Sequence, residues 1–299
     1  NSRMLYRQIA EMFPFRGNES PFSFRANTTV GIGGTAPLAL FPETAEDCVC
    51  AVRFLKREGV PYILLGNGSN VLVSDKGFDG AVICTRRMKT IRVDACGVYA
   101  ESGAALDAVV LAAAECGWGG LSFLCGIPAT LGGALFMNAG ARGKYMDSVV
   151  LRVDALVDGE KKSLSLAECG YSYKTSRFMQ EDCVILGGLL RGVPEEKEKI
   201  VQDIRAARLA RKDLPKGKSL GCVFRNPQGD SAGRLIEAAG LKGLAQGGAE
   251  VSAQHANFII NRGGATASDY AALVRRVKER VFSETGTMLA EEIRYIGEF

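Results

Sequence analysis

The run Gly66-Asn67-Gly68-Ser69-Asn70 combines residue types that are suited to holding an anion. Glycine lets backbone N–H groups turn inward, and the hydroxyl and amide side chains add further donors. Val71 stands where a dinucleotide-binding fingerprint has its third glycine, and a strand-like run follows in place of a helix. No Gly-Lys-Ser/Thr follows, so the run is not a Walker loop either. We therefore predict a phosphate-binding turn, with a plain β-turn as the alternative.

A second glycine-rich segment begins at Gly126-Ile127-Pro128 and continues to Asn138-Ala139-Gly140. Pro128 suits the first turn of a short helix, whose unpaired N–H groups could face a phosphate or the edge of an isoalloxazine ring. The alternative is a small-residue helix that packs closely on a sheet. Two uncharged, donor-rich segments in one half of the chain together indicate a large anionic cofactor held by backbone groups.

Alternating apolar runs and turn residues predict the elements that would position these segments. Helices are predicted at residues 45–58, 104–116, 195–211, 231–239 and 268–283. Strands are predicted at residues 62–65, 71–73, 81–85, 90–93, 149–157, 184–190, 258–261 and 293–296. The first thirty residues are polar and mixed, and the main boundary is predicted near Pro194.

Composition indicates a soluble globular protein, because 47% of the residues are hydrophobic and 23% are charged. A net charge of +4 without a long Lys/Arg run argues against a nucleic-acid partner. The 9 cysteines form no C-x-x-C pair, which indicates reduced thiols in the cytoplasm, and a single histidine leaves little for a metal site. The uncharged stretch from Cys116 to Ala141 contains Pro128 and Asn138, which weaken a membrane-spanning helix. We expect a cytoplasmic protein that binds no metal, membrane or nucleic acid.

Six segments carry a resemblance to a known family. They read YILLGNGSNVLVSDKGFDGAVI (62–83), GIPATLGGALFMNAGARGKYMD (126–147), YSYKTSRF (171–178), GCVFRNP (221–227), GLKGLAQGGAEVSAQHANFIINRGGATASD (240–269) and LAEEIRYIG (289–297). In this order they resemble the UDP-N-acetylenolpyruvoylglucosamine reductase (UDP-N-acetylmuramate dehydrogenase) family, and the likeness covers nearly everything after residue 27. The short linking segments are similar to the family's shorter form, which lacks a tyrosine-bearing loop.

The resemblance implies an enzyme with noncovalent FAD that uses NADPH to reduce UDP-N-acetylglucosamine enolpyruvate to UDP-N-acetylmuramate, in peptidoglycan synthesis. It also implies an α+β fold with two FAD-binding subdomains of the vanillyl-alcohol-oxidase (PCMH) type, at residues 1–86 and 87–194. A C-terminal α+β substrate-binding domain would follow at residues 195–299, with a last strand that could return to the FAD-binding part. We expect a cytoplasmic monomer.

The implied reaction needs an acid and a positive charge. Hydride addition to the enolpyruvyl group leaves negative charge next to a carboxylate, and that charge needs a donor or cation placed beforehand and then a proton. By resemblance, Cys222 is the proton donor, where most members have a serine, and Glu292 supports the intermediate. Lys174 stands where the family has an arginine, so it keeps the charge but loses the two-pronged hydrogen bonding.

The resemblance also implies binding residues. The expected substrate contacts are Arg225 and Asn226, at the uridine diphosphate. The expected cofactor contacts lie in the two glycine-rich segments and are Gly66, Asn67, Gly68, Ser69, Asn70, Val71, Gly126, Ile127, Pro128, Thr130, Gly132, Gly133, Asn138, Ala139 and Gly140. A strand at the C-terminal end would put Glu292 and Arg294 on one face.

Three other functions stay open at this point. A Cys222–His255 dyad could serve acyl or group transfer, although we interpret His255 as structural. A different flavin oxidoreductase, such as an alcohol oxidase, could use the same cofactor scaffold. A non-catalytic binder of a flavin or nucleotide sugar is the third possibility.

Overall fold

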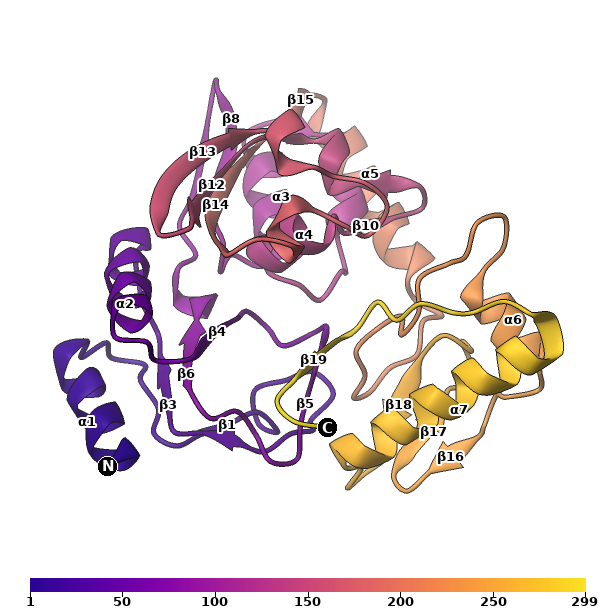
Figure 1. The fold of residues 1–299 in the computed structure, drawn as a ribbon. Helices are drawn as coiled ribbons and strands as arrows, with labels where there is room; N and C mark the ends of the chain where they lie inside the picture. Colours follow the sequence, from indigo (N-terminus) through magenta and orange to yellow (C-terminus); the bar gives the residue numbers. More distant parts are fainter. The chain divides into compact units, whose positions relative to one another are not determined.

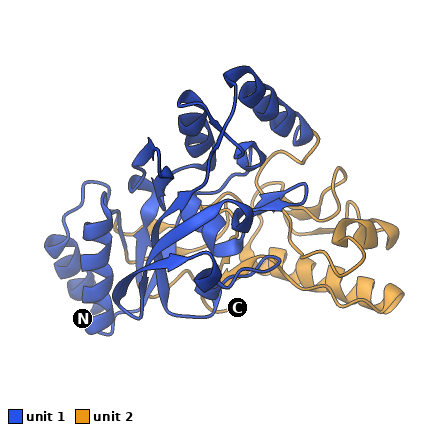
Figure 2. Ribbon diagram, turned by 90° about the horizontal axis from the view of Figure 1, so that it is seen from above, with its two compact units in different colours: residues 1–19, 39–66, 81–212 blue, residues 20–38, 67–80, 213–299 orange.

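The computed structural model describes residues 1–299, and the chain folds as two units that each gather separated stretches of sequence (Figures 1 and 2). The first unit contains residues 1–19, 39–66 and 81–212, and the second contains residues 20–38, 67–80 and 213–299. Each unit combines helices with strands, which confirms the predicted α+β class. The subdomain boundaries expected at residues 86 and 194 stay predictions.

In the first unit, β4 (Tyr62–Leu65) pairs in parallel with β6 (Ala81–Cys84), whose other neighbour is β3 (Leu38–Leu40). All of β6 is fully buried. Helix α2 (Ala45–Arg57) begins after Thr44, because the Thr44 hydroxyl accepts the N–H of Asp47 as an N-cap. Its buried residues recur at helical spacing, so one stripe of the helix faces the core. Helix α1 (Ser2–Met12) precedes these elements and buries Tyr6 and Ile9.

An antiparallel sheet of five strands carries the rest of the first unit. Its order is β13 (Glu160–Ser165), β12 (Val150–Val157), β14 (Cys183–Leu190), β8 (Gly97–Glu101) and β7 (Ile91–Asp94). Helices α3 (Leu106–Glu115) and α4 (Leu131–Met137) pack on this sheet, and α5 (Lys197–Ala210) contacts α3 (Figure 1). Two short pairs complete the unit: β9 (Trp118–Gly119) with β15 (Val193–Pro194), and β10 (Gly140–Ala141) with β11 (Lys144–Tyr145). No helix combines the length and the apolar character that crossing a membrane requires.

The second unit is built around helix α7 (Ala267–Thr285), which begins with a capping box between Thr266 and Asp269. The Asp75 carboxylate also accepts the N–H groups of Ala267 and Ser268. The remaining elements are α6 (Ala232–Ala238), the sheet β16 (Ala245–Gln246), β17 (Ala249–Val251) and β18 (Ile259–Asn261), the pair β1 (Phe22–Ser23) and β2 (Thr35–Ala36), and the parallel pair β5 (Val71–Val73) and β19 (Arg294–Ile296).

Two predictions about elements need correction, and one helix was missed. Helix α4 begins at Leu131 after the N-cap Thr130, so Pro128 precedes the helix and does not lie in its first turn. The last strand begins at Arg294, and a bend at residue 293 separates Glu292 from it, so Glu292 and Arg294 do not share a strand face. Helix α1 was missed, because the first thirty residues were interpreted as a polar, mixed segment with no regular element.

Candidate functional site

The loop of residues 66–70 leaves its backbone donors open. The N–H groups of residues 66–69 donate no hydrogen bond to another part of the chain. The loop is nevertheless held in place, because Thr29 donates its N–H to the carbonyl of Gly68 at 3.1 Å and its hydroxyl to the carbonyl of Ser219 at 2.7 Å. A row of unpaired amides on a fixed loop is suited to an anion such as a phosphate.

Two glycines of this loop have no room for a side chain. A Cβ on Gly66 would lie 2.7 Å from Oγ1 of Thr130. Gly68 has a φ of +63°, and its Cβ would lie 2.8 Å from the carbonyl oxygen of Asn27. Glycine is therefore required for the loop's backbone to follow this path.

The second glycine-rich segment differs from our expectation, because its helix has no unpaired N–H groups. The N–H of Leu131 donates to the carbonyl of Ala104, and the N–H of Gly132 donates to the carbonyl of Ser102, both at 2.8 Å. Gly133 and Ala134 donate to the hydroxyl and the carbonyl of Thr130. The small residues instead allow close packing, since a Cβ on Gly132 would lie 2.8 Å from Cβ of Ser102.

Ser102 was not predicted as a site residue. Its side chain is buried, and its hydroxyl has no hydrogen-bond partner in the protein. A buried hydroxyl without a partner is uncommon and indicates a position where a ligand group could complete the bonding. No pattern in the sequence marks Ser102, because its position follows from the packing of α4 against residues 102–104.

Asn138 is buried and ends α4 in the left-handed conformation, with a φ of 50°. Its side-chain amide donates to the carbonyl of Ser172 at 3.0 Å, and its side-chain oxygen accepts the N–H of Asp147 at 2.9 Å. Asn138 therefore connects the second glycine-rich segment to the turn that carries Lys174.

Lys174 lies at the tip of a tight turn in the first unit. Ser172 and Thr175 exchange backbone hydrogen bonds of 3.2 Å, which places Tyr173 and Lys174 between them. Lys174 has a φ of 52°, and its Nζ lies 6.0 Å from the ring centre of Tyr145. The turn presents a partly exposed ammonium group on a firmly anchored backbone.

Cys222 and Glu292 lie on neighbouring segments of the second unit. The chain at 222–225 runs between residues 257–258 on one side and 290–292 on the other, through the bridges Cys222–Phe258 and Phe224–Glu291. The N–H of Glu292 donates to the carbonyl of Val223 at 2.8 Å. Cys222 is exposed and Glu292 is partly exposed, so both side chains are accessible to a ligand.

The first glycine-rich loop also contacts this pair of segments. The side-chain amide of Asn70 donates to the carbonyl of Glu292 at 3.2 Å, and the N–H of Arg294 donates to the carbonyl of Asn70 at 2.9 Å. Strand β19 then continues alongside β5, with Arg294 opposite Val71. Asn70 of the predicted anion loop is thus joined by hydrogen bonds to Glu292 and to Arg294, all within the second unit.

Arg225 and Asn226, which follow Cys222, are held by one backbone and one side-chain hydrogen bond. Arg225 donates its N–H to the carbonyl of Ala290 at 2.8 Å, while its buried Nε has no partner in the protein. The side-chain Oδ1 of Asn226 accepts the N–H of Ala232, the first residue of α6, at 3.0 Å. A buried guanidinium nitrogen that is left open is suited to an anionic ligand.

His255 has a structural position. Its Nδ1 accepts the N–H of Asn257 at 3.2 Å, and its ring centre lies 5.0 Å from that of Phe258. Burial is the main cause that lowers the pKa of His255, and nearby Lys242 adds to the effect. A neutral imidazole that accepts a backbone hydrogen bond supports the chain near Cys222, and this contact favours the structural interpretation over a Cys222–His255 dyad.

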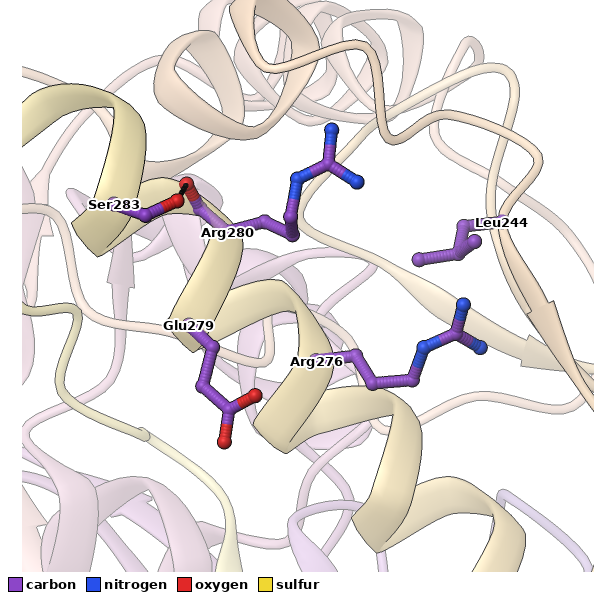
Figure 3. Close-up of a pocket in the computed structure, with 5 residues that line it drawn as sticks. All are labelled: Leu244, Arg276, Glu279, Arg280 and Ser283. Atoms are coloured by element: carbon purple, nitrogen blue, oxygen red, sulfur yellow. Dashed lines mark hydrogen bonds between the residues drawn. The ribbon is translucent and has the colours of Figure 1, made fainter.

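A surface pocket of about 330 Å³ in the second unit is not this site (Figure 3). Arg276 and Arg280 extend from α7 toward Leu244, and Glu279 and Ser283 also line the pocket. Arg276 already donates to the carbonyl of Ala245, and Arg280 already donates to Glu284. None of the predicted site residues lines this pocket.

Comparison with known proteins gives two family matches. Residues 36–161 match the family described as "FAD binding domain". Residues 212–296 match the family described as "UDP-N-acetylenolpyruvoylglucosamine reductase, C-terminal domain". The first match includes both glycine-rich segments, and the second includes Cys222 and Glu292.

Individual proteins agree with the family matches. A UDP-N-acetylenolpyruvoylglucosamine reductase of Carboxydothermus hydrogenoformans is 40% identical over 277 residues, which is 91% of either chain. A crystal structure of UDP-N-acetylenolpyruvylglucosamine reductase from Thermus caldophilus superposes with a TM-score of 0.82 and 37% identity, over 95% of this chain and 100% of that chain. Wild-type Phl p 4.0202, a glucose dehydrogenase, has a TM-score of 0.50 and 13% identity over 66% of this chain and 45% of that chain, which indicates a shared fold alone.

Proposed function

The chain belongs to the UDP-N-acetylenolpyruvoylglucosamine reductase family and is an FAD-binding oxidoreductase, and from this we propose which reaction it performs. It reduces the enolpyruvyl group of UDP-N-acetylglucosamine enolpyruvate to give UDP-N-acetylmuramate, with NADPH as the hydride donor. The product serves peptidoglycan synthesis, and the enzyme works in the cytoplasm.

The residues present fit a noncovalently bound FAD. The open amides of residues 66–69 are suited to its diphosphate, and the unpartnered hydroxyl of Ser102 is available for a polar group of the cofactor. The second glycine-rich segment, from Gly126 to Gly140, would contribute close packing, since its helix amides are already bonded within the chain. FAD supplies the two-electron chemistry that passes a hydride from NADPH to the substrate.

Cys222 is the proton donor in this proposal. A thiol is a general acid that can give its proton to a carbanion. The side chain is exposed on a backbone that is bonded on both sides, which suits a group that must meet substrate in a fixed position.

Glu292 and Lys174 stabilise the intermediate in which negative charge develops next to the substrate carboxylate. Glu292 is fixed one hydrogen bond away from Val223, the residue that follows Cys222. Lys174 brings a positive charge on a short anchored turn, and a cation placed beforehand stabilises an enolate without costly rearrangement. Arg225 and Asn226 hold the uridine diphosphate, with the open Nε of Arg225 directed to a phosphate oxygen.

The observation that carries the proposal is the hydrogen bond from the N–H of Glu292 to the carbonyl of Val223, because it brings Glu292 beside the Cys222 segment. The side-chain amide of Asn70, in the first glycine-rich loop, donates to the carbonyl of Glu292 as well. An anaerobic absorbance trace of the holoenzyme tests it. We expect the flavin bands to bleach with NADPH and to return when UDP-N-acetylglucosamine enolpyruvate is added. Bleaching without return would point to another acceptor, and a protein that takes up no flavin would refute the proposal.

A further inference from the structure

We propose that Asn257 is a positioning residue that fixes Cys222 against Glu292. The inference rests on the proposed function, because it assigns a role to Asn257 in the protonation that Cys222 would perform. Asn257 is 3% exposed, so it does not contact substrate itself.

The segment that carries Cys222 has few regular strand contacts. Residues 222–225 belong to no extended ladder and make only isolated bridges to their neighbours. The N–H of Val223 donates to the carbonyl of Asn257 at 2.9 Å, and the carbonyl of Val223 accepts the N–H of Glu292. The N–H and carbonyl groups of the next residue, Phe224, make no hydrogen bond to a neighbouring strand and need other partners.

The side chain of Asn257 supplies both partners of Phe224. Its Oδ1 accepts the N–H of Phe224 at 3.0 Å, and its Nδ2 donates to the carbonyl of Phe224 at 2.9 Å. A carboxamide carries a donor and an acceptor side by side, so it can replace a neighbouring peptide group in this way. Aspartate offers only acceptors when ionised, and alanine offers neither partner.

Asn257 is itself held firmly. Its N–H donates to Nδ1 of His255, and the chain around it is tied by a hydrogen bond of 2.9 Å from the N–H of Ser252 to the carbonyl of Phe258. The clamp on Phe224 is therefore anchored in the fold. Because Cys222 lies two residues before Phe224 and Glu291 bridges to Phe224, the clamp fixes the register of the Cys222 segment relative to Glu292.

Loss of the clamp should affect one half-reaction. Displacement of a reacting group by about 1 Å can slow a step by about 10²-fold. For Asn257→Ala we expect reoxidation of the flavin by UDP-N-acetylglucosamine enolpyruvate to slow by at least about 10-fold, while reduction by NADPH stays within about 2-fold. Asn257→Asp keeps the acceptor for the Phe224 N–H, so it should show a smaller loss of the same kind.

Asn261 provides a matched control. It is also a buried asparagine of the second unit, with its amide bonded to the carbonyl of Val30 and its oxygen bonded to the N–H groups of Gly263 and Ala265. Asn261→Ala should lower the melting temperature as Asn257→Ala does, without a selective loss of reoxidation. Hydrogen exchange at Phe224 should accelerate in Asn257→Ala and not in Asn261→Ala.

A double-mutant cycle with Cys222→Ala decides whether Asn257 acts through the thiol. In that background we expect Asn257→Ala to slow reoxidation by no more than about 3-fold further, because the group it positions is gone. Equal slowing of both half-reactions, or the full loss repeated in the Cys222→Ala background, would overturn the role of Asn257. If Cys222→Ala alone leaves reoxidation unchanged, the proton donor of the proposed function fails, and the positioning role falls with it.

Discussion

At the scale of single residues, Lys174 combines a charge with a strained backbone. The left-handed backbone conformation of Lys174 costs of order 1 kcal/mol. Two hydrogen bonds anchor the turn that imposes it: the side-chain amide of Asn138 donates to the carbonyl of Ser172, and the hydroxyl of Ser176 donates to the carbonyl of Phe136. Such strain persists only where the surrounding structure determines it, and it is often found at functional positions.

Two substitutions of Lys174 test this interpretation. Lys174→Arg should keep kcat or raise it a few-fold, because a guanidinium adds a second hydrogen bond to a carboxylate or enolate. Lys174→Met should lower kcat by about 10²-fold, as expected when one preorganised donor is removed. Steady-state kinetics at saturating NADPH compares them. A large drop for Lys174→Arg, or none for Lys174→Met, would mean that the ammonium group has another task.

Among the candidate site residues, those in recognisable motifs could be proposed from the sequence, and those defined by packing could not. Cys222, Glu292 and Lys174 were identified because each lies in a segment that resembles the family. Their roles stay predictions. Ser102 and Asn257 acquire their surroundings from contacts with distant segments, and Asn257 and Phe224 are 33 positions apart in the sequence. Single-sequence patterns do not reveal such contacts.

At the scale of elements, the loop of residues 66–70 depends on glycine at a position with positive φ. Gly68→Ala would strain the backbone and bring a Cβ within 2.8 Å of the Asn27 carbonyl oxygen. We expect this variant to lose bound FAD and about 1–3 kcal/mol of unfolding free energy. The ratio of flavin to protein absorbance and a thermal melt measure the two effects.

Gly59 is the matched control, since its φ is +67° and a Cβ there would meet no atom within 4 Å. Gly59→Ala should lose only the modest stability that a left-handed alanine costs, about 1 kcal/mol, and should keep its flavin. Full flavin content in Gly68→Ala would contradict the role of this loop in holding the cofactor.

The packing of α7 gives a second prediction at this scale. Tyr270 is fully buried in the core, and its hydroxyl has no hydrogen-bond partner in the protein. An unsatisfied buried hydroxyl destabilises the fold, so Tyr270→Phe should raise the unfolding free energy by about 1 kcal/mol. Tyr171→Phe should lower it by about 1 kcal/mol, because the Tyr171 hydroxyl donates to the carbonyl of Leu135 at 2.6 Å. Chemical denaturation distinguishes the two, and a loss of stability in Tyr270→Phe would show that its hydroxyl is bonded.

Local patterns predicted the bounds of several elements and gave no strand pairings. Strands β4 and β5 have the predicted bounds, because short apolar runs are bounded by glycine, proline or polar residues there. The start of α4 was wrong because the cap at Thr130 determines it, not the proline at 128. The pairing of β19 with β5 joins residues more than two hundred positions apart, and no local pattern encodes it.

At the scale of the whole molecule, the two units share one chain that passes between them several times. The loop of residues 66–70 begins in the first unit at Gly66 and continues in the second from Asn67. Cys222, Glu292, Arg225 and Asn226 belong to the second unit, whereas Lys174 and the second glycine-rich segment belong to the first. The residues named in the proposal are thus divided along the chain between the stretches of the two units.

The stability of the folded chain should depend on pH through its single histidine. Burial lowers the pKa of His255 in the folded state, and the Nδ1 that accepts the Asn257 N–H must be unprotonated. The unfolded chain takes up a proton near its ordinary pKa of about 6.5, so it binds more protons than the folded chain below that pH. The stability that neutral His255 contributes is fully present above about pH 6.5. It is lost as the pH falls through the lower pKa that His255 has in the folded state.

Denaturant melts of the wild type and of His255→Gln between pH 5 and pH 7.5 measure this effect. The wild type should lose unfolding free energy as the pH falls, and the variant should show a flatter dependence in the same interval. Identical slopes would indicate that carboxylates, not His255, govern acid stability here.

The most direct test of the proposed chemistry separates the two half-reactions in Cys222 variants. In anaerobic stopped flow, Cys222→Ala should be reduced by NADPH at the wild-type rate, while its reoxidation by UDP-N-acetylglucosamine enolpyruvate should slow by about 10²-fold or more, as expected when a general acid is removed. Cys222→Ser should recover much of that rate, because its hydroxyl can also donate a proton. An unchanged reoxidation rate in Cys222→Ala, or an equal loss in both half-reactions, would contradict the assignment of Cys222 as the proton donor.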